Sequence, residues 1–399
     1  MTFSDTVTGI ISTFEGQVMS AEQRIIINEH RTGCGRIAGH ITLNKPASLN
    51  ALDLDMASAM LNQLNVWAQQ EDVLFIIIDG AGEKAFCAGG DIVSMYHAMK
   101  SAPGTIPPFI RDFFTVEYEL DYTLHTYPKP VVVWGDGIVM GGGMGLLQGA
   151  SHRVVTDKSR LAMPEVTIGL FPDVGGSYFL PRLTGQLGLF LGLTAAQVNG
   201  AEAVKYGLAD HLCAHSDLAD LITQWKSTEW KSGSREDVAG MLAKSLNAGT
   251  ADASPENSQP GDRIAPWLER INAACSLQSI QDVVAAITAI DAGGDKWMLK
   301  AQQALASGSP LTAALFYRQF QKGKTQSLAD SFRMELNMAC HCAQYGELQE
   351  GIRALLIDKD GKPGWRFNSV AGVSDSDIDP FFSSPWQSGH PLAGLGESI

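Results

Sequence analysis

The chain has 399 residues, of which 45% are hydrophobic and 18% charged, and its formal net charge is -14 at pH 7. This composition suits a globular enzyme with a sizeable core, in one large domain or two smaller ones. The acidic balance argues against a nucleic-acid partner, because phosphate binding requires a basic surface. The six cysteines form no C-x-x-C pair, which predicts free thiols in a reducing compartment. The sequence shows neither a secretory-signal pattern nor a membrane-spanning stretch, so we expect a cytoplasmic protein with no membrane partner.

The first half of the chain alternates between strand-like and helix-like segments. Short runs of β-favouring residues predict strands at 25–27, 39–43, 73–78, 131–134 and 153–156. Apolar residues at helical spacing predict a helix over 53–70 that is capped by Asp53, and another helix should begin within the glycines 141–143. Strands that alternate with helices predict an α/β fold whose active site lies at loop and helix ends.

The composition changes after about residue 215. Residues 218–356 are mostly helix-patterned, and a segment rich in Ala, Ser, Pro, Gly and Asn at 248–262 predicts an exposed loop. We therefore expect four parts in the chain: an N-terminal extension (1–24), an α/β core (25–215), a helical C-terminal region (216–357) and an irregular tail (358–399).

Three glycine-bearing segments are the candidates for chemistry. They read FCAGGD at 86–91, GDGIVMGGGMG at 135–145 and MPEVTIGLFPDVGG at 163–176. Glycine lets the backbone approach a ligand closely, and glycines that open a helix present free N–H groups, two of which could form an oxyanion hole. The middle segment fits neither dinucleotide-binding nor P-loop spacing, because Gln148 replaces the required last glycine and no lysine follows.

These segments, in this order and spacing, resemble the crotonase or enoyl-CoA hydratase/isomerase superfamily over nearly the whole chain. The resemblance implies a spiral of ββα units with a helical C-terminal region that covers the site or builds a homo-oligomer. It also implies that the N–H groups of Gly90 and Gly142 hold the thioester carbonyl of an acyl-CoA substrate.

The carboxylates separate the branches of this superfamily. The hydratases carry two catalytic glutamates, whereas this chain has Glu165 at the second position and Gly145 at the first. A further acid, Asp173, follows Glu165. Together with YFLPR at 178–182 and EGIRALLIDKD at 350–360, this pattern resembles the 3-hydroxyisobutyryl-CoA hydrolases. In that branch, a glutamate that matches Glu117 lies close to the substrate.

The resemblance implies hydrolysis of a short-chain 3-hydroxyacyl-CoA, with coenzyme A as part of the substrate and no metal or redox cofactor. Glu165 would activate a water as a general base or attack the thioester directly, and the sequence leaves both routes open. Asp173 would orient the water or contact the substrate hydroxyl. The predicted catalytic residues are Glu165 and Asp173, and the predicted substrate-binding residues are Glu117, Gly142, Glu165 and Asp173.

Several of the candidate residues also have a simpler, structural interpretation. Pattern alone would place Glu117 on the solvated face of a helix, and Asp173 could be a turn residue. His211 and His215, four residues apart, are better explained as surface or core histidines than as metal ligands, and Cys87 as a packing residue than as a nucleophile. The alternatives for the whole chain are an enoyl-CoA hydratase/isomerase and a non-catalytic CoA-binding protein.

Overall fold

The computed structural model describes residues 24–230, 233–249 and 261–397. The larger sheet has six strands in the order β1-β2-β3-β5-β7-β10. These strands are β1 (Ile25–Arg31), β2 (Ile37–Leu43), β3 (Val73–Gly80), β5 (Val131–Gly135), β7 (His152–Thr156) and β10 (His211–Cys213). Only β1 runs antiparallel to its neighbour within this sheet, and the remaining pairs are parallel. All five predicted strands are confirmed.

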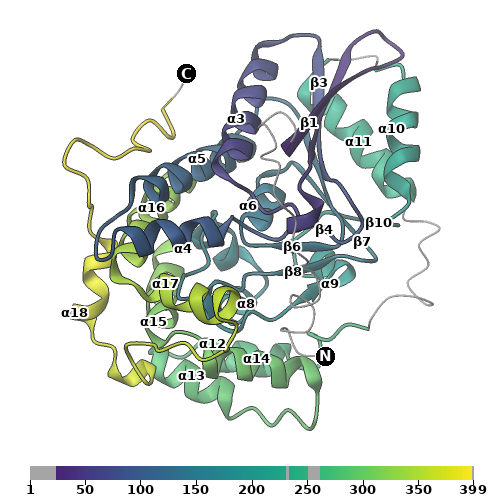
Figure 1. Cartoon of the computed structure of the whole chain (residues 1–399). Coiled ribbons are helices and arrows are strands. Elements are labelled where there is room, and N and C mark those ends of the chain that lie inside the picture. The colour runs from purple at the N-terminus through teal and green to yellow at the C-terminus, as the bar shows by residue number, and fades with distance from the viewer. Residues whose placement is uncertain (1–23, 231–232, 250–260, 398–399) are drawn as a thin grey trace.

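Both faces of the larger sheet are covered, as expected for a mostly parallel sheet. Phe75 and Ile77 of β3 pack on one face, where the neighbouring helices are α10 (Asp217–Ser227) and α11 (Arg235–Gly249). Ile76 and Ile78 point to the other face and join the main core, on the side of α3 (Leu54–Gln69), α5 (Pro108–His125) and α6 (Gly142–Gly149) (Figure 1). The run of apolar residues in β3 is therefore explained by burial on both sides.

The helices predicted from the sequence are present at the expected places. Asp53 caps α3 by accepting a hydrogen bond from the Met56 N–H, and α6 begins within the glycine cluster. Between these helices lies α4 (Ile92–Ser101), and α5 packs along both α3 and α6. The α5–α6 contact brings the second glycine segment close to the helix that carries Glu117.

A second sheet has the order β4-β6-β8-β9 and was not predicted as separate strands. Its members are β4 (Ala85–Cys87), β6 (Ile138–Met140), β8 (Arg160–Ala162) and β9 (Val198–Asn199). Strands of two or three residues carry too short a pattern to be recognised. They matter here because β4 and β6 end at the first two glycine segments, and β8 ends just before Glu165.

After Cys213 the described chain contains no further strand. After α10 and α11, the described chain continues with α12 (Leu268–Cys275), α13 (Ile280–Thr288), α14 (Lys296–Ser307), α15 (Pro310–Gly323), α16 (Leu328–Tyr345) and α17 (Glu347–Ile352). Helix α16 runs against α5 (Figure 1). The last segment is mostly irregular but includes α18 (Asp375–Ile378), and it buries Phe381 and Leu392.

Part of the predicted loop at 248–262 lies in α11, and its residues 250–260 are outside the described residues. The predicted N-terminal extension is likewise outside them, apart from its last residue. Across the ranges that the structure describes, every helix is too short or too polar to cross a membrane.

Candidate active site

Two glycine backbones adjoin at the start of α6. Leu52 donates its N–H to the Gly89 carbonyl (2.8 Å) and accepts a hydrogen bond from the Asp91 N–H (2.7 Å). These two hydrogen bonds form a parallel β-bridge between Leu52 and Gly90. In this geometry the Gly90 N–H faces away from Leu52. Gly142 is the first residue of α6, so its N–H has no partner within the helix. A Cβ built on Gly89 would lie 3.9 Å from the Gly142 nitrogen, so the two predicted oxyanion donors belong to neighbouring segments.

Two carboxylates flank this pair of glycines. A Cβ built on Gly142 would collide with Oε1 of Glu117, and one built on Gly141 would lie 3.3 Å from Oε1 of Glu165. Glu117 projects from α5, whereas Glu165 opens the short helix Glu165–Ile168 that follows β8. Both side chains are buried. The prediction from helix pattern that Glu117 is solvated is therefore wrong, because α6 and α16 cover this face of α5.

Asp173 lies in a tight turn, and its charge acts on both Glu117 and Glu165. Its Oδ2 accepts a hydrogen bond from the Tyr118 hydroxyl at 2.8 Å. The next residue, Val174, has a φ of 51°, a conformation that is uncommon for a β-branched residue. Such a backbone persists only where the surroundings hold it in place, so the Asp173 turn must be fixed from outside.

The C-terminal helices hold this turn. Glu335 of α16 accepts hydrogen bonds from the N–H groups of Gly175 (2.8 Å) and Ser177 (2.9 Å), and from the Ser177 hydroxyl. Gln319 of α15 donates to the Pro172 carbonyl at 2.7 Å. The helical region that follows the α/β core therefore contributes directly to the geometry of Asp173.

The carboxylates at the site have raised pKa values. Burial, followed by repulsion from Asp173, raises the pKa of Glu117 and Glu165 well above the usual range. Burial also raises the pKa of Asp173 to about 7, although the hydrogen bond from Tyr118 favours its ionised form. Buried acids that repel each other titrate as a group, so this group holds protons near neutrality.

Replacing Tyr118 with phenylalanine is expected to raise the pKa of Asp173 further. The lost hydrogen bond stabilises the ionised carboxylate, and a bond to a charged group contributes about 1.5–3 kcal/mol, or about 1–2 pH units. The inflection expected near pH 7 in the pH profile of kcat/KM, which reports the protein without substrate, should move upward by that amount. An unchanged profile would contradict a titrating Asp173.

Asp121 belongs to the same group of acids and was missed by the sequence interpretation. It lies one helical turn after Glu117 on α5, is fully buried, and its Oδ2 lies 2.5 Å from where a Cβ on Gly145 would be. Burial and repulsion from Glu117 raise its pKa well above the usual range. The available signal was its i, i+4 spacing from Glu117, combined with the missing carboxylate at Gly145.

Cys87 and the pair His211 and His215 each have an ordinary structural environment in the described residues. The Cys87 thiol is buried, and burial raises its pKa to about 12, so it is a packing residue. His211 lies in β10 beside Asn247, and His215 contacts Asp136 at 2.7 Å. Within the described ranges, no three His, Cys, Asp or Glu side chains are grouped to hold a metal ion.

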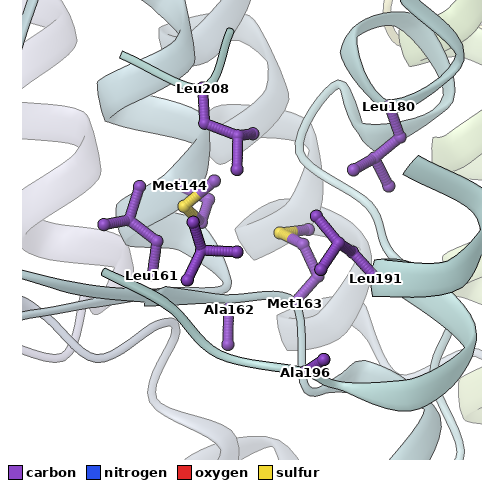
Figure 2. A pocket seen from close by; sticks show the side chains of 9 residues that line it. Met144, Leu161, Ala162, Met163, Leu180, Leu191, Ala196 and Leu208 are labelled. Carbon is purple, nitrogen blue, oxygen red and sulfur yellow. The ribbon is translucent and has the colours of Figure 1, made fainter. Parts of the chain in front are cut away.

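A small apolar pocket lies between α6 and the segments that precede and follow Glu165. Its side chains point toward one another (Figure 2). They belong to Met144, Leu161, Ala162, Met163, Leu180, Leu191, Ala196, Val198 and Leu208. With no charged or polar side chain in its lining, this pocket is an apolar support behind α6 rather than a second polar site.

Known proteins are similar to the chain over most of its length. The family described as enoyl-CoA hydratase/isomerase matches residues 38–382. A mitochondrial 3-hydroxyisobutyryl-CoA hydrolase of Danio rerio is 40% identical over 87% of this chain and 87% of that protein. The Homo sapiens protein of the same name is 36% identical over 89% and 87%, respectively.

Two solved structures share the fold. An enoyl-CoA hydratase from Rhodobacter sphaeroides 2.4.1 has a TM-score of 0.76 and 30% identity, covering 91% of this chain and 98% of that one. A carnitinyl-CoA dehydratase from Mycobacterium thermoresistibile has a TM-score of 0.77 and 33% identity, covering 94% and 100%. The predicted fold class is confirmed.

The expectation of a cytoplasmic protein is wrong, because the curated relatives are named as mitochondrial. Free cysteines indicate a reducing environment without saying which compartment provides it. The N-terminal pattern on which the expectation also rested falls in residues 1–23, outside the described residues.

Proposed function

This chain belongs to the enoyl-CoA hydratase/isomerase family, and we propose that it hydrolyses 3-hydroxyisobutyryl-CoA to 3-hydroxyisobutyrate and free CoA. The observation that carries the proposal is the arrangement at Gly145. The hydratases of this family carry a glutamate at that position, whereas here the Asp121 carboxyl, 2.5 Å from where a Cβ on Gly145 would be, leaves no room for a side chain at residue 145. The names of the curated relatives support the same substrate.

The two oxyanion donors would make the largest electrostatic contribution to stabilising the transition state. Attack on a thioester places negative charge on the carbonyl oxygen, which the N–H groups of Gly90 and Gly142 would receive. Each well-placed donor is worth about 3–4 kcal/mol of transition-state stabilisation. Because both donors belong to fixed backbone, no reorganisation is needed as the charge develops.

Glu165 would be the principal catalytic group. As a general base it takes a proton from water while the water oxygen bonds to the carbonyl carbon. As a nucleophile it bonds to that carbon, expels CoA thiolate and leaves a mixed anhydride for water to hydrolyse. In either route Asp173 would orient the water or bind the substrate hydroxyl, and Glu117 would contact the substrate beside Gly142.

The same chemistry needs no metal or redox cofactor, since the backbone donors polarise the carbonyl and the carboxylates move the protons. Coenzyme A enters only as part of the substrate. A homo-oligomer stays a prediction, because a single chain is described.

The test supplies 3-hydroxyisobutyryl-CoA and, separately, crotonyl-CoA to the wild-type protein. Free CoA is followed with a thiol reagent, and the enoyl group by its absorbance. We expect thiol release from the hydroxyacyl substrate and little change with crotonyl-CoA. The solved relatives are named hydratase and dehydratase, so the competing outcome is hydration of crotonyl-CoA without thiol release, which would overturn the proposal.

A further inference from the structure

Three polar side chains follow one face of α5 at four-residue spacing. They are Glu117, Asp121 and His125, and each has a buried polar atom without a hydrogen-bond partner: Glu117 Oε1, both Asp121 oxygens and His125 Nε2. Buried polar groups are normally satisfied by protein or by ordered water. Three consecutive exceptions on one helix face therefore indicate a path for water or protons.

The facing surface of α6 leaves room for this row. The glycines Gly142 and Gly145 lie opposite Glu117 and Asp121, and a Cβ on either glycine would collide with the corresponding carboxylate. A Cβ on Gly149, one turn further, would collide with the Cβ of Leu124 at 2.7 Å, and its other near neighbours are backbone atoms of Asp121 and His125. The glycines of α6 thus make room for the Glu117 and Asp121 carboxyls and let the two helices pack closely as far as His125.

The row ends at a pocket away from the oxyanion donors. This pocket has a volume of about 230 Å³ and is lined by His125, Gln148, Arg153, Tyr178, Phe179, Arg182, Leu183 and Gly207. Gly207 and Arg182 are exposed and Arg153 is half-buried, so the pocket reaches the surface. Gln148 follows Gly142 by six residues, which is about 9 Å along the helix at 1.5 Å per residue.

We propose that Asp121 is a proton-relay residue that connects the site at Gly142 with this pocket through His125. This inference rests on the proposed function, because thioester hydrolysis supplies the proton. Water and thioester give a carboxylic acid and a thiol. At neutral pH the acid ionises and the thiol does not, so each turnover releases one net proton once the thioester is cleaved and while the products still occupy the site.

The relay proceeds in short steps along α5. Side chains four residues apart on a helix have Cβ atoms about 5–6 Å apart, so a proton would pass from Glu117 to Asp121 and from Asp121 to His125 either directly or over one bridging water. A proton from the hydrolytic step passes to Glu117, and the Asp121 carboxyl accepts it on one oxygen and gives up a proton from the other. His125 accepts that proton on one ring nitrogen and releases one from the other into the pocket.

The surroundings of the relay keep its members close to neutral. Asp121 faces Glu117 on its own helix, Asp173 on the neighbouring turn and Glu335 on α16. Burial, together with the smaller effect of the Arg153 charge, lowers the pKa of His125 to about 4. A neutral imidazole and a protonated carboxyl pass protons without accumulating a buried charge.

The test uses Asp121→Asn and His125→Phe, with Glu119→Gln as the matched control. Asparagine keeps the shape of Asp121 but cannot exchange a carboxyl proton, and phenylalanine keeps the ring of His125. Glu119 lies on the exposed face of the same helix. In weak buffer we expect kcat to fall about tenfold in both relay variants with KM little changed. High concentrations of imidazole or formate should restore kcat, because small buffers carry the proton through the pocket.

Either of two results would overturn the relay: full kcat of Asp121→Asn in weak buffer, or a loss that no buffer restores in either variant. The wild type and Glu119→Gln, assayed for thiol release in the same buffers, separate this outcome from failure of the proposed function. If the wild type releases no CoA, the function fails; if it does and the variants show no rescue, only the relay fails.

Discussion

Replacing Glu165 with glutamine will abolish most CoA release while leaving the substrate bound. Glutamine has the same shape but can neither accept a proton from water nor form an anhydride, so kcat should fall by about 10²–10⁴. Its amide also removes one member of a group of repelling acids, and Glu165 Oε2 has no hydrogen-bond partner to lose. The folded state should therefore be no less stable than the wild type.

The measurement combines steady-state thiol release with calorimetric binding of the substrate. Glu165→Asp is the matched variant, because it keeps the carboxylate but withdraws it by one methylene, and it should retain part of the activity. Trapping with hydroxylamine during turnover separates the two routes, since only a mixed anhydride leaves a modified Glu165. Wild-type rates in Glu165→Gln would contradict the assignment of this residue.

Much of the core and of the candidate site could be predicted because local sequence signals coincide with it. The β-favouring run of β3, the Asp53 cap of α3 and the glycine start of α6 each depend on a few adjacent residues. The same is true of Glu165 and Asp173, which stand in short motifs beside glycines. Such features are fixed by backbone geometry, and backbone geometry is what local patterns report.

The parts of the site that the sequence did not predict depend on contacts between distant segments. Asp121 lies in a helix whose sequence resembles any amphipathic helix, and only its packing against Gly145 shows that its carboxyl fills the place of a missing side chain. Glu335 accepts a hydrogen bond from the hydroxyl of Ser177, which lies 158 residues away in the sequence. A glutamate on the apolar face of α16, between Phe332 and Ala339, was the available sign that it must find buried donors.

Replacing Glu335 with alanine will lower both stability and activity, because the carboxylate joins the C-terminal region to the Asp173 turn. Its loss leaves the N–H groups of Gly175 and Ser177 and the Ser177 hydroxyl buried without a partner. Each unsatisfied group costs about 1–3 kcal/mol, and the cost of burying the carboxylate itself is relieved at the same time. We expect a net loss of roughly 2–5 kcal/mol in urea unfolding, and a lower kcat because Asp173 is no longer held.

The Glu335→Gln variant removes the ionisable carboxyl group but keeps the shape of the side chain and an oxygen that accepts hydrogen bonds. It therefore tests the effect of the charge separately from that of the hydrogen bonds. Burial raises the pKa of Glu335 from an ordinary value of 4.5 to about 8. An acid with a raised pKa in the folded state binds its proton more tightly there than in the unfolded chain. Its contribution to stability is therefore complete below about pH 4.5 and is lost as the pH rises toward about 8. Wild-type stability should fall across this range by a few kcal/mol more than that of Glu335→Gln. Equal slopes in the two proteins would show that Glu335 stays ionised when buried, and that the donors at Gly175 and Ser177 outweigh its desolvation.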